Sequence, residues 1–287
     1  MIIGTRDSRL ALAQTDIFIE TAVAHTDETM TIKKIKTAGD TDQTSELKDI
    51  GGYGAFVREL DNALVAKEID VSVNSMKDVP VFRDTEIIIG AVLPRASCED
   101  VILPMRIDEL PFGAVVGSSS VRRTVILKSM RPDLEIKGLR GNIDTRLGKL
   151  DRGEYDAIIL AKAGLDRLSI KREMHTLSID DFVPAPGQGA IAVACRSSDR
   201  DIIDILGKTD DADTRAETQA ERSIMRLMGG ICSSPIGINA KRERDRLMIK
   251  GVFFDGTVLR RIDSTVPLDH TASDLERVAS ELKGIGK

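Results

Sequence analysis

Short runs of β-branched and aliphatic residues alternate with segments of helical hydrophobic period along much of this chain. In the first series, strands are expected at 1–5, 30–36, 71–75 and 87–92, with helices at 8–24, where Ser8 is the expected N-cap, and at 55–66. A second series has expected strands at 101–103, 114–117, 135–137 and 157–160, with helices at 121–130, 143–150 and 162–168. Such alternation predicts two α/β lobes, each with a mostly parallel sheet and helices on both faces.

Two breaks divide these series. The first is Pro94-Arg95, and the second is the segment 183–187, VPAPG, after which 190–195 has the pattern of another strand. Two breaks that bracket a middle lobe indicate that the chain crosses twice between lobes, which allows hinge closure over a cleft. From about residue 211, a long helix, three strands and a final helix indicate a small α+β domain. We expect domain 1 at 1–94 and 189–209, domain 2 at 95–188 and domain 3 at 210–287.

Composition excludes several classes of partner. With 41 Lys and Arg against 46 Asp and Glu, the net charge of −5 favours neither nucleic acid nor an anionic membrane. The absence of Trp and the 3% aromatic content disfavour base-stacking surfaces. No apolar run reaches the length of a membrane span, and the chain opens directly into a strand without a charged and apolar leader. We therefore expect a cytoplasmic protein.

The segment 71–80, VSVNSMKDVP, begins as a strand and ends in polar residues. Ser75, Lys77 and Asp78 come just before Pro80, which stops extended pairing. Open α/β sheets usually bind ligands at the carboxyl ends of their strands. The segment therefore predicts ligand chemistry, and the alternative is a solvated turn with a weak Lys77–Asp78 pair.

A second polar segment, 117–123 with the sequence GSSSVRR, follows another expected strand and opens a helix. Free N–H groups and the positive end of the helix dipole attract anions, and Ser119 and Ser120 add donors. The alternative is a serine N-cap followed by solvated arginines. Arg122 and Arg123 in the first turn run against the dipole preference, which favours the anion site.

Cations recur at equivalent strand ends and first helical turns, at Arg6, Lys77, Arg122, Arg123, Arg140, Arg146 and Arg167. Arginine pairs in a bidentate manner with carboxylates or phosphates, so the ligand should be a polyphosphate or a polycarboxylate. The chain has neither a P-loop nor a strand-linked G-x-G-x-x-G, which weakens the nucleotide interpretation. Gln188, between two glycines, belongs either to a hinge or to a plain turn.

The three cysteines differ in their surroundings. They lie far apart without a C-x-x-C, which argues against a disulfide framework and, with only three histidines, against a metal site. Cys195 lies in an apolar run, whereas Cys232 lies in the loop GGICSSP. A loop cysteine of this kind is more exposed than a core cysteine, and so more available for covalent chemistry.

Taken together, nine blocks of the sequence resemble the porphobilinogen deaminase (hydroxymethylbilane synthase) family. They are GTRDSRLALAQ, FVRELDNAL, SMKDVP, GSSSVRR, RPDLEIKGLRGNIDTRL, GEYDAIILAKAGLDRL, PAPGQGA, AERSIMR and CSSPIG, in the family's order. The resemblance covers nearly the whole chain. It implies two lobes like type II periplasmic binding proteins, a third domain, and a dipyrromethane cofactor joined by a thioether to Cys232.

The resemblance also implies a reaction and its residues. Four porphobilinogen molecules would be condensed head-to-tail with loss of ammonia, and the linear tetrapyrrole would be released by hydrolysis. Asp78 would stabilise the electron-poor methylene-pyrrole and move protons. The cofactor would be bound by Ser75, Lys77, Ser119, Ser120, Arg122, Arg123, Arg140 and Arg146. The incoming substrate would be bound by Arg6, Ser8, Arg167 and Gln188.

We expect a monomer that passes its product to uroporphyrinogen-III synthase. The sequence departs from the family pattern at Ala38, Asp49, Tyr53, Asn74 and Ile231.

The alternative function is a non-catalytic, cytoplasmic polyanion-binding protein of the same two-lobed fold. Such a protein would need neither a carboxylate among its arginines nor a loop thiol, so Asp78 and Cys232 discriminate between the two.

Overall fold

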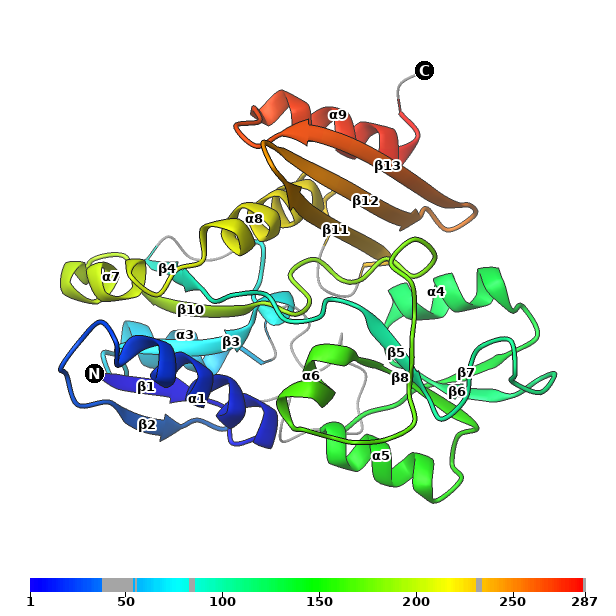
Figure 1. Ribbon diagram of the computed structural model, residues 1–287, viewed down its shortest axis with the longest axis horizontal. Coiled ribbons are helices and arrows are strands. Elements are labelled where there is room, and N and C mark those ends of the chain that lie inside the picture. The colour runs from blue at the N-terminus through cyan, green and yellow to red at the C-terminus, as the bar shows by residue number, and fades with distance from the viewer. Residues whose placement is uncertain (38–53, 55, 83–85, 231–233, 286–287) are drawn as a thin grey trace. The chain divides into compact units, whose positions relative to one another are not determined.

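The computed structural model in Figure 1 describes residues 1–37, 54, 56–82, 86–230 and 234–285. The predicted loop at 37–54 and the cysteine at 232 therefore lie largely or wholly outside the described residues. By its contacts the chain forms two compact units. Unit 1 comprises Met1–Ala96 and Gly189–Arg215, and unit 2 comprises Ser97–Gln188 and Ala216–Lys287. The division into three domains stays a prediction.

Unit 1 is built on a five-stranded sheet of order β2-β1-β3-β10-β4 (Figure 1). Its strands are β1 (Ile2–Thr5), β2 (Thr31–Lys34), β3 (Val71–Ser75), β4 (Ile87–Val92) and β10 (Ile191–Arg196). Its helices are α1 (Arg9–Ala22), α3 (Arg58–Val65), the 3-10 helix η1 (Met76–Asp78) and α7 (Arg200–Gly207). The predicted strands and helices of this unit are present, and α7 is an addition to them.

The sheet of unit 1 is parallel except for one strand. β1 pairs in parallel with β2 and β3, whereas β10 is antiparallel to both β3 and β4. β10 is the first strand after the chain returns at Gly189. A core of Ile3, Phe18, Val71, Val193 and Leu206, each at most 2% exposed, joins the sheet to α1 and α7. Burial of these apolar side chains provides most of the unit's stabilisation.

The first part of unit 2 repeats this plan in a sheet of order β7-β6-β8-β5-β9. Its elements are β5 (Asp100–Leu103), β6 (Val115–Gly117), α4 (Val121–Met130), β7 (Glu135–Lys137), α5 (Ile143–Asp151), β8 (Ala157–Ala161), α6 (Lys162–Arg167) and β9 (His175–Thr176). β6 is parallel to β7 and β8, whereas β5 is antiparallel to β8 and β9. Here too, the antiparallel strand is the first after the chain enters the unit.

The C-terminal part of unit 2 is an antiparallel sheet of order β11-β12-β13 with a helix on it (Figure 1). Its elements are α8 (Ala212–Leu227), which begins in unit 1, β11 (Ile236–Glu243), β12 (Arg246–Phe254), β13 (Leu259–Pro267) and α9 (Ala272–Lys283). A capping box of Thr271 and Asp274 starts α9, and Gly284 with a φ of +73° ends it. Two α/β sheets and a small α+β part agree with the predicted fold class.

Two carboxylates of α8 satisfy the free edge of β11. The backbone N–H of Ala240 donates to Glu221 at 2.8 Å, and that of Arg242 donates to Glu217 at 2.9 Å. A third N–H, of Ile238, donates to the carbonyl of Pro184 at 3.0 Å. Glu221 also accepts from Gly187 N at 2.6 Å, so it joins the segment before Gln188 to the C-terminal sheet. An edge strand with satisfied N–H groups does not template pairing with other chains.

Among the described residues, no helix combines the length and apolarity that a bilayer crossing requires.

Glu221→Ala should lower the melting temperature strongly. The carboxylate is fully buried and accepts from two backbone N–H groups, which would lose their acceptor. Two unsatisfied buried donors cost about 2–4 kcal/mol, equivalent to a fall of roughly 5–15 °C. The matched control is Glu276→Ala on the exposed face of α9. Differential scanning calorimetry that shows equal melting temperatures for the two variants would contradict this structural role.

Candidate active site

The end of β3 presents a carboxylate that has no partner among the described residues. Met76 is 1% exposed and its N–H donates to Ala190 O at 3.0 Å, which pins the start of η1. Lys77 and Asp78 follow on η1 and are half-buried. Within the described part of the chain, no group donates a hydrogen bond to Asp78 or forms an ion pair with it. The weak Lys77–Asp78 pair considered from the sequence is therefore not formed, and the Asp78 carboxylate has its acceptor capacity unused.

The predicted substrate residues of unit 1 lie at the same sheet edge. β1 and β3 are parallel neighbours, so the segments after both strands meet at one edge. Ser8 caps α1 by accepting from Ala11 N at 3.2 Å, as predicted. The Arg6 guanidinium lies over the Phe56 ring at 4.4 Å from its centroid. This edge carries five of the predicted residues, namely Arg6, Ser8, Ser75, Lys77 and Asp78.

Helix α1 also contacts the end of β3 directly. Gln14 is 3% exposed and its Nε2 donates to Ser75 Oγ at 2.9 Å. This bond orients the hydroxyl of Ser75, a predicted cofactor residue. Asn74, one of the departures from the family pattern, is buried and donates from Nδ2 to Ser72 Oγ at 3.1 Å.

In unit 2, the three serines organise the loop before α4. Ser120 is the N-cap of α4 and accepts from Arg123 N at 3.4 Å. Ser119 Oγ donates to Leu139 O and accepts from Leu139 N, each at 2.9 Å. Ser119 thus joins the loop after β6 to the loop after β7, next to Arg140. The serine N-cap expected from the sequence is present.

The two arginines that follow are buried. Arg122 is 3% exposed and Arg123 is 7% exposed, so the alternative with solvated arginines is wrong. Their partner is Asp100, the first residue of β5, which is 0% exposed. Arg122 Nη2 lies 2.8 Å from Asp100 Oδ2, and Arg123 Nη2 lies 2.7 Å from Oδ1. Their predicted role as cofactor ligands stays a prediction.

Gln188 completes this cluster. It is 1% exposed, and its Nε2 donates at 2.8 Å both to Asp100 Oδ1 and to the carbonyl of Cys98. Its backbone forms a turn, with the Gln188 N–H donating to Ala185 O at 3.0 Å, at the point where the chain leaves unit 2. The plain turn is therefore present, and the hinge stays a prediction. Gly187 and Gly189 on either side have φ values of +74° and +90°, which other residues rarely adopt.

The electrostatics of the cluster keep Asp100 ionised. Burial alone would raise the pKa of its carboxyl, but the charges and hydrogen bonds of Arg122 and Arg123 outweigh burial and lower the pKa well below its ordinary value. Burial lowers the pKa of Arg122, and Asp100 opposes this effect. One carboxylate faces two guanidinium groups, so the three side chains carry one surplus positive charge.

The remaining predicted cations of unit 2 follow β7 and β8, the parallel neighbours of β6. Arg146 lies on α5, whose N-cap is Asn142, and its Nε donates to Gly141 O at 2.8 Å. Arg140 precedes this helix, and Arg167 ends α6. Burial lowers the pKa of Arg167 to about 10, so it stays charged at neutral pH. The edge therefore gathers five arginines that suit a ligand with several carboxylates.

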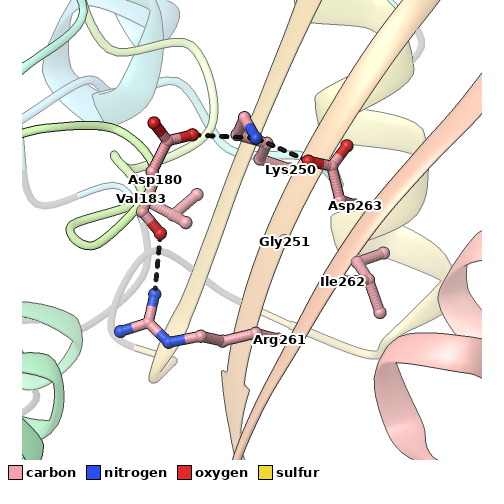
Figure 2. Close-up of a pocket in the computed structure, with 7 residues that line it drawn as sticks. All are labelled: Asp180, Val183, Lys250, Gly251, Arg261, Ile262 and Asp263. Atoms are coloured by element: carbon pink, nitrogen blue, oxygen red, sulfur yellow. Dashed lines mark hydrogen bonds and ion pairs between the residues drawn. The ribbon is translucent and has the colours of Figure 1, made fainter.

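A pocket of about 360 Å³ elsewhere in unit 2 is charged but internally neutralised (Figure 2). Lys250 lies on β12 between Asp180 and Asp263, at 2.8 and 2.6 Å. Arg261 donates to the carbonyl of Asp181 at 2.8 Å. None of the predicted site residues lines this pocket, and its two acidic and two basic side chains balance in charge.

Asp100 is not among the residues predicted from the sequence, although three predicted site residues converge on it. Its only local signal is a carboxylate at the head of the apolar run DVIL, where an unpaired acid would be costly. Cys232, Ala38, Asp49, Tyr53 and Ile231 lie outside the described residues.

Acid should abolish the stabilisation that Asp100 provides. Its folded pKa lies below the unfolded value of about 3.9, so the contribution is complete above that value and is lost as the pH falls below it. The difference in melting temperature between wild type and Asp100→Asn should be constant from about pH 7 to 5 and should shrink below about pH 4. Scanning calorimetry across this range is the test. A difference that already declines between pH 7 and 5 would contradict the assignment.

Comparison with known proteins gives one consistent family. Residues 1–204 match the domain described as "Porphobilinogen deaminase, dipyromethane cofactor binding domain", and residues 216–284 match "Porphobilinogen deaminase, C-terminal domain". The porphobilinogen deaminase of Lysinibacillus sphaericus is 41% identical over 293 residues, covering 99% of this chain and 93% of that protein. The probable porphobilinogen deaminase of Methanosarcina acetivorans is 44% identical over 276 residues, covering 93% and 86%.

Two solved structures are similar at low scores. The aliphatic sulphonate binding protein SsuA of Escherichia coli has a TM-score of 0.43 at 14% identity, covering 81% of this chain and 75% of that one. A substrate binding domain of a putative amino acid transporter from Streptococcus pneumoniae has a TM-score of 0.45 at 13% identity, covering 72% and 90%. Family models and full-length relatives agree with each other, whereas no comparison supports a non-catalytic binding protein. The chain belongs to the porphobilinogen deaminase family.

Proposed function

We propose that this chain is a hydroxymethylbilane synthase. It condenses four porphobilinogen molecules head-to-tail, releases one ammonia for each, and hydrolyses the product from the enzyme as a linear tetrapyrrole. The observation that carries the proposal is the gathering of arginines at one sheet edge of unit 2, with a surplus of positive charge. Porphobilinogen carries an acetate and a propionate, so its oligomers are polycarboxylates and suit such a surface.

The residues present fit a dipyrromethane cofactor. Arg122 and Arg123 share a single carboxylate, and the Nε atom of each is buried without a hydrogen-bond partner among the described residues. A buried surplus of charge and unused donors favour an anion, and the cofactor's side chains are carboxylates. When bound through Cys232, the cofactor supplies the free pyrrole α-carbon to which the first substrate is joined.

The cofactor carboxylates are bound by the cationic and hydroxyl side chains around it. Arg122, Arg123, Arg140 and Arg146 supply guanidinium groups, with Lys77 as a point charge and Ser75, Ser119 and Ser120 as hydroxyl donors. Fixing several carboxylates orients the pyrrole rings and pre-organises the reaction geometry. Ser119, Arg122 and Arg123 are held by hydrogen bonds within unit 2, so their orientation requires little further ordering.

Asp78 is the catalytic residue of this proposal. Loss of ammonia from porphobilinogen leaves an electron-poor methylene-pyrrole, and a carboxylate near the pyrrole nitrogens stabilises that positive charge. The same carboxylate accepts the proton that the attacking ring loses when aromaticity returns. The half-buried position of Asp78 and the absence of a partner for it in the described part of the chain support this role.

The incoming porphobilinogen is bound by Arg6, Ser8, Arg167 and Gln188. We further propose that the enzyme is a cytoplasmic monomer. Its linear product is reactive and closes into a ring, so we expect transfer to a uroporphyrinogen-III synthase. The family's reaction and the chain's acidic net charge, which favours neither membrane nor nucleic acid, support this setting.

Intact-protein mass spectrometry tests the cofactor and its anchor. Wild type should carry a mass excess equal to two linked pyrrole units, and Cys232→Ser should carry none. Cys98→Ser, at a half-buried cysteine, is the matched control and should retain the excess. If wild type shows no excess even after incubation with porphobilinogen, the proposed function is wrong. An excess retained in Cys232→Ser would refute the anchor alone.

Asp78→Asn should reduce turnover by about 10²–10⁴ without changing the melting temperature, because the amide can neither accept the proton nor balance the positive charge. The measurement is the rate of porphobilinogen consumption by protein of verified cofactor content. Asp16→Asn, on the exposed face of α1, is the control and should react normally. Rates of Asp78→Asn within threefold of wild type would exclude the catalytic role.

A further inference from the structure

We infer that Asp100 is a positioning residue for cofactor loading: its buried carboxylate holds Arg122 and Arg123 in the orientation that binds the cofactor carboxylates. This inference rests on the proposed function and deepens it. Asp100 belongs to none of the sequence blocks that carry the family resemblance.

Three donors from distant parts of the chain converge on this one carboxylate. Oδ2 accepts from Arg122 Nη2 at 2.8 Å, and Oδ1 accepts from Arg123 Nη2 at 2.7 Å. Oδ1 also accepts from Gln188 Nε2 at 2.8 Å. With 0% exposure and both oxygens bonded, Asp100 is not available to a ligand and acts only through its partners.

The other end of each guanidinium is also fixed. Arg122 Nη1 donates to Val183 O at 2.7 Å, and Arg123 Nη1 donates to Ile159 O at 3.0 Å. The stem of Arg122 packs against Gly237 of β11, where an added Cβ would lie 3.1 Å from Arg122 Cδ. Each planar guanidinium is therefore held between Asp100 and a backbone carbonyl, and these two contacts fix the orientation of its plane.

The charge of the cluster explains why one carboxylate suits this role. Without Asp100, two guanidinium groups would be buried side by side, and their repulsion would drive them apart or out to solvent. A second carboxylate would neutralise both and remove the attraction for an anion. One carboxylate keeps the pair in place and leaves one surplus positive charge for the ligand.

Asp100→Asn is the direct test, because the amide keeps the shape of the carboxylate but removes its charge. The amide also places an NH₂ group, which cannot accept a hydrogen bond, opposite at least one of the three donor side chains. Apoprotein from a host that makes no porphobilinogen is incubated with porphobilinogen, and loading is followed by intact mass. The variant should load at least tenfold more slowly than wild type per folded molecule. The gain in melting temperature on loading should also be smaller, because a group that interacts less favourably with the folded state stabilises it less.

Asp210→Asn is the matched control, because Asp210, like Asp100, forms an ion pair with an arginine. It pairs with Arg215 and accepts from Val92 N at 2.7 Å, and it belongs to unit 1, whereas the cluster belongs to unit 2. Both variants should melt at a lower temperature than wild type, and only Asp100→Asn should load slowly. Asp100→Glu, which keeps the charge, should load faster than Asp100→Asn.

Three outcomes decide the inference. Wild-type loading by folded Asp100→Asn overturns it, as does equally slow loading by Asp210→Asn, which would indicate a general loss of stability. If Asp100→Asn does not fold, Arg122→Lys and Arg123→Lys decide, because lysine keeps the positive charge but lacks the planar fork that Asp100 orients. Wild-type loading by both folded lysine variants would then overturn the inference. Failure of wild type itself to load would instead refute the proposed function.

Discussion

The ion pairs between one buried carboxylate and two adjacent guanidinium groups organise the site in unit 2. Asp100 opens β5, Arg122 and Arg123 open α4, and Gln188 ends the segment before the chain leaves the unit. Buried ion pairs often contribute little net stability, because desolvation offsets the Coulomb attraction. Their effect here is geometric: three elements are held at one point, and two cations are kept in the interior.

Residues 183–187, which precede Gln188, also form hydrogen bonds with α4, β11 and α8. Val183 O accepts from Arg122, Pro184 O accepts from Ile238 N, and Gly187 N donates to Glu221. The cluster and the C-terminal sheet are therefore connected through a few consecutive residues. Glu217 and Glu221 satisfy the edge of β11 from α8, so this sheet needs no fourth strand. These contacts explain why 97–188 and 216–287 form one compact unit.

Both α/β sheets place their chemistry by the same geometric rule. Parallel neighbours end at one edge, so short motifs separated in sequence gather there. In unit 1 these are the segments after β1 and β3, and in unit 2 they are the segments after β6, β7 and β8. Each edge carries part of the set of cations, hydroxyls and carboxylate that the proposed reaction uses.

Local pattern in the sequence by itself determined the strands, most helices, the serine N-caps at 8 and 120, and the cations at the strand ends. These features depend on neighbouring residues, whose periodicity and capping chemistry are visible in one dimension. Only the tertiary structure decided that β5 and β10 run antiparallel to their sheets, that Arg122 and Arg123 are buried, and that Asp100 is their partner. Asp100 and Gln188 are 88 positions apart, and a contact over that separation leaves no local signal. Its energy comes from burial and complementary charge, which exist only once the sheet has assembled.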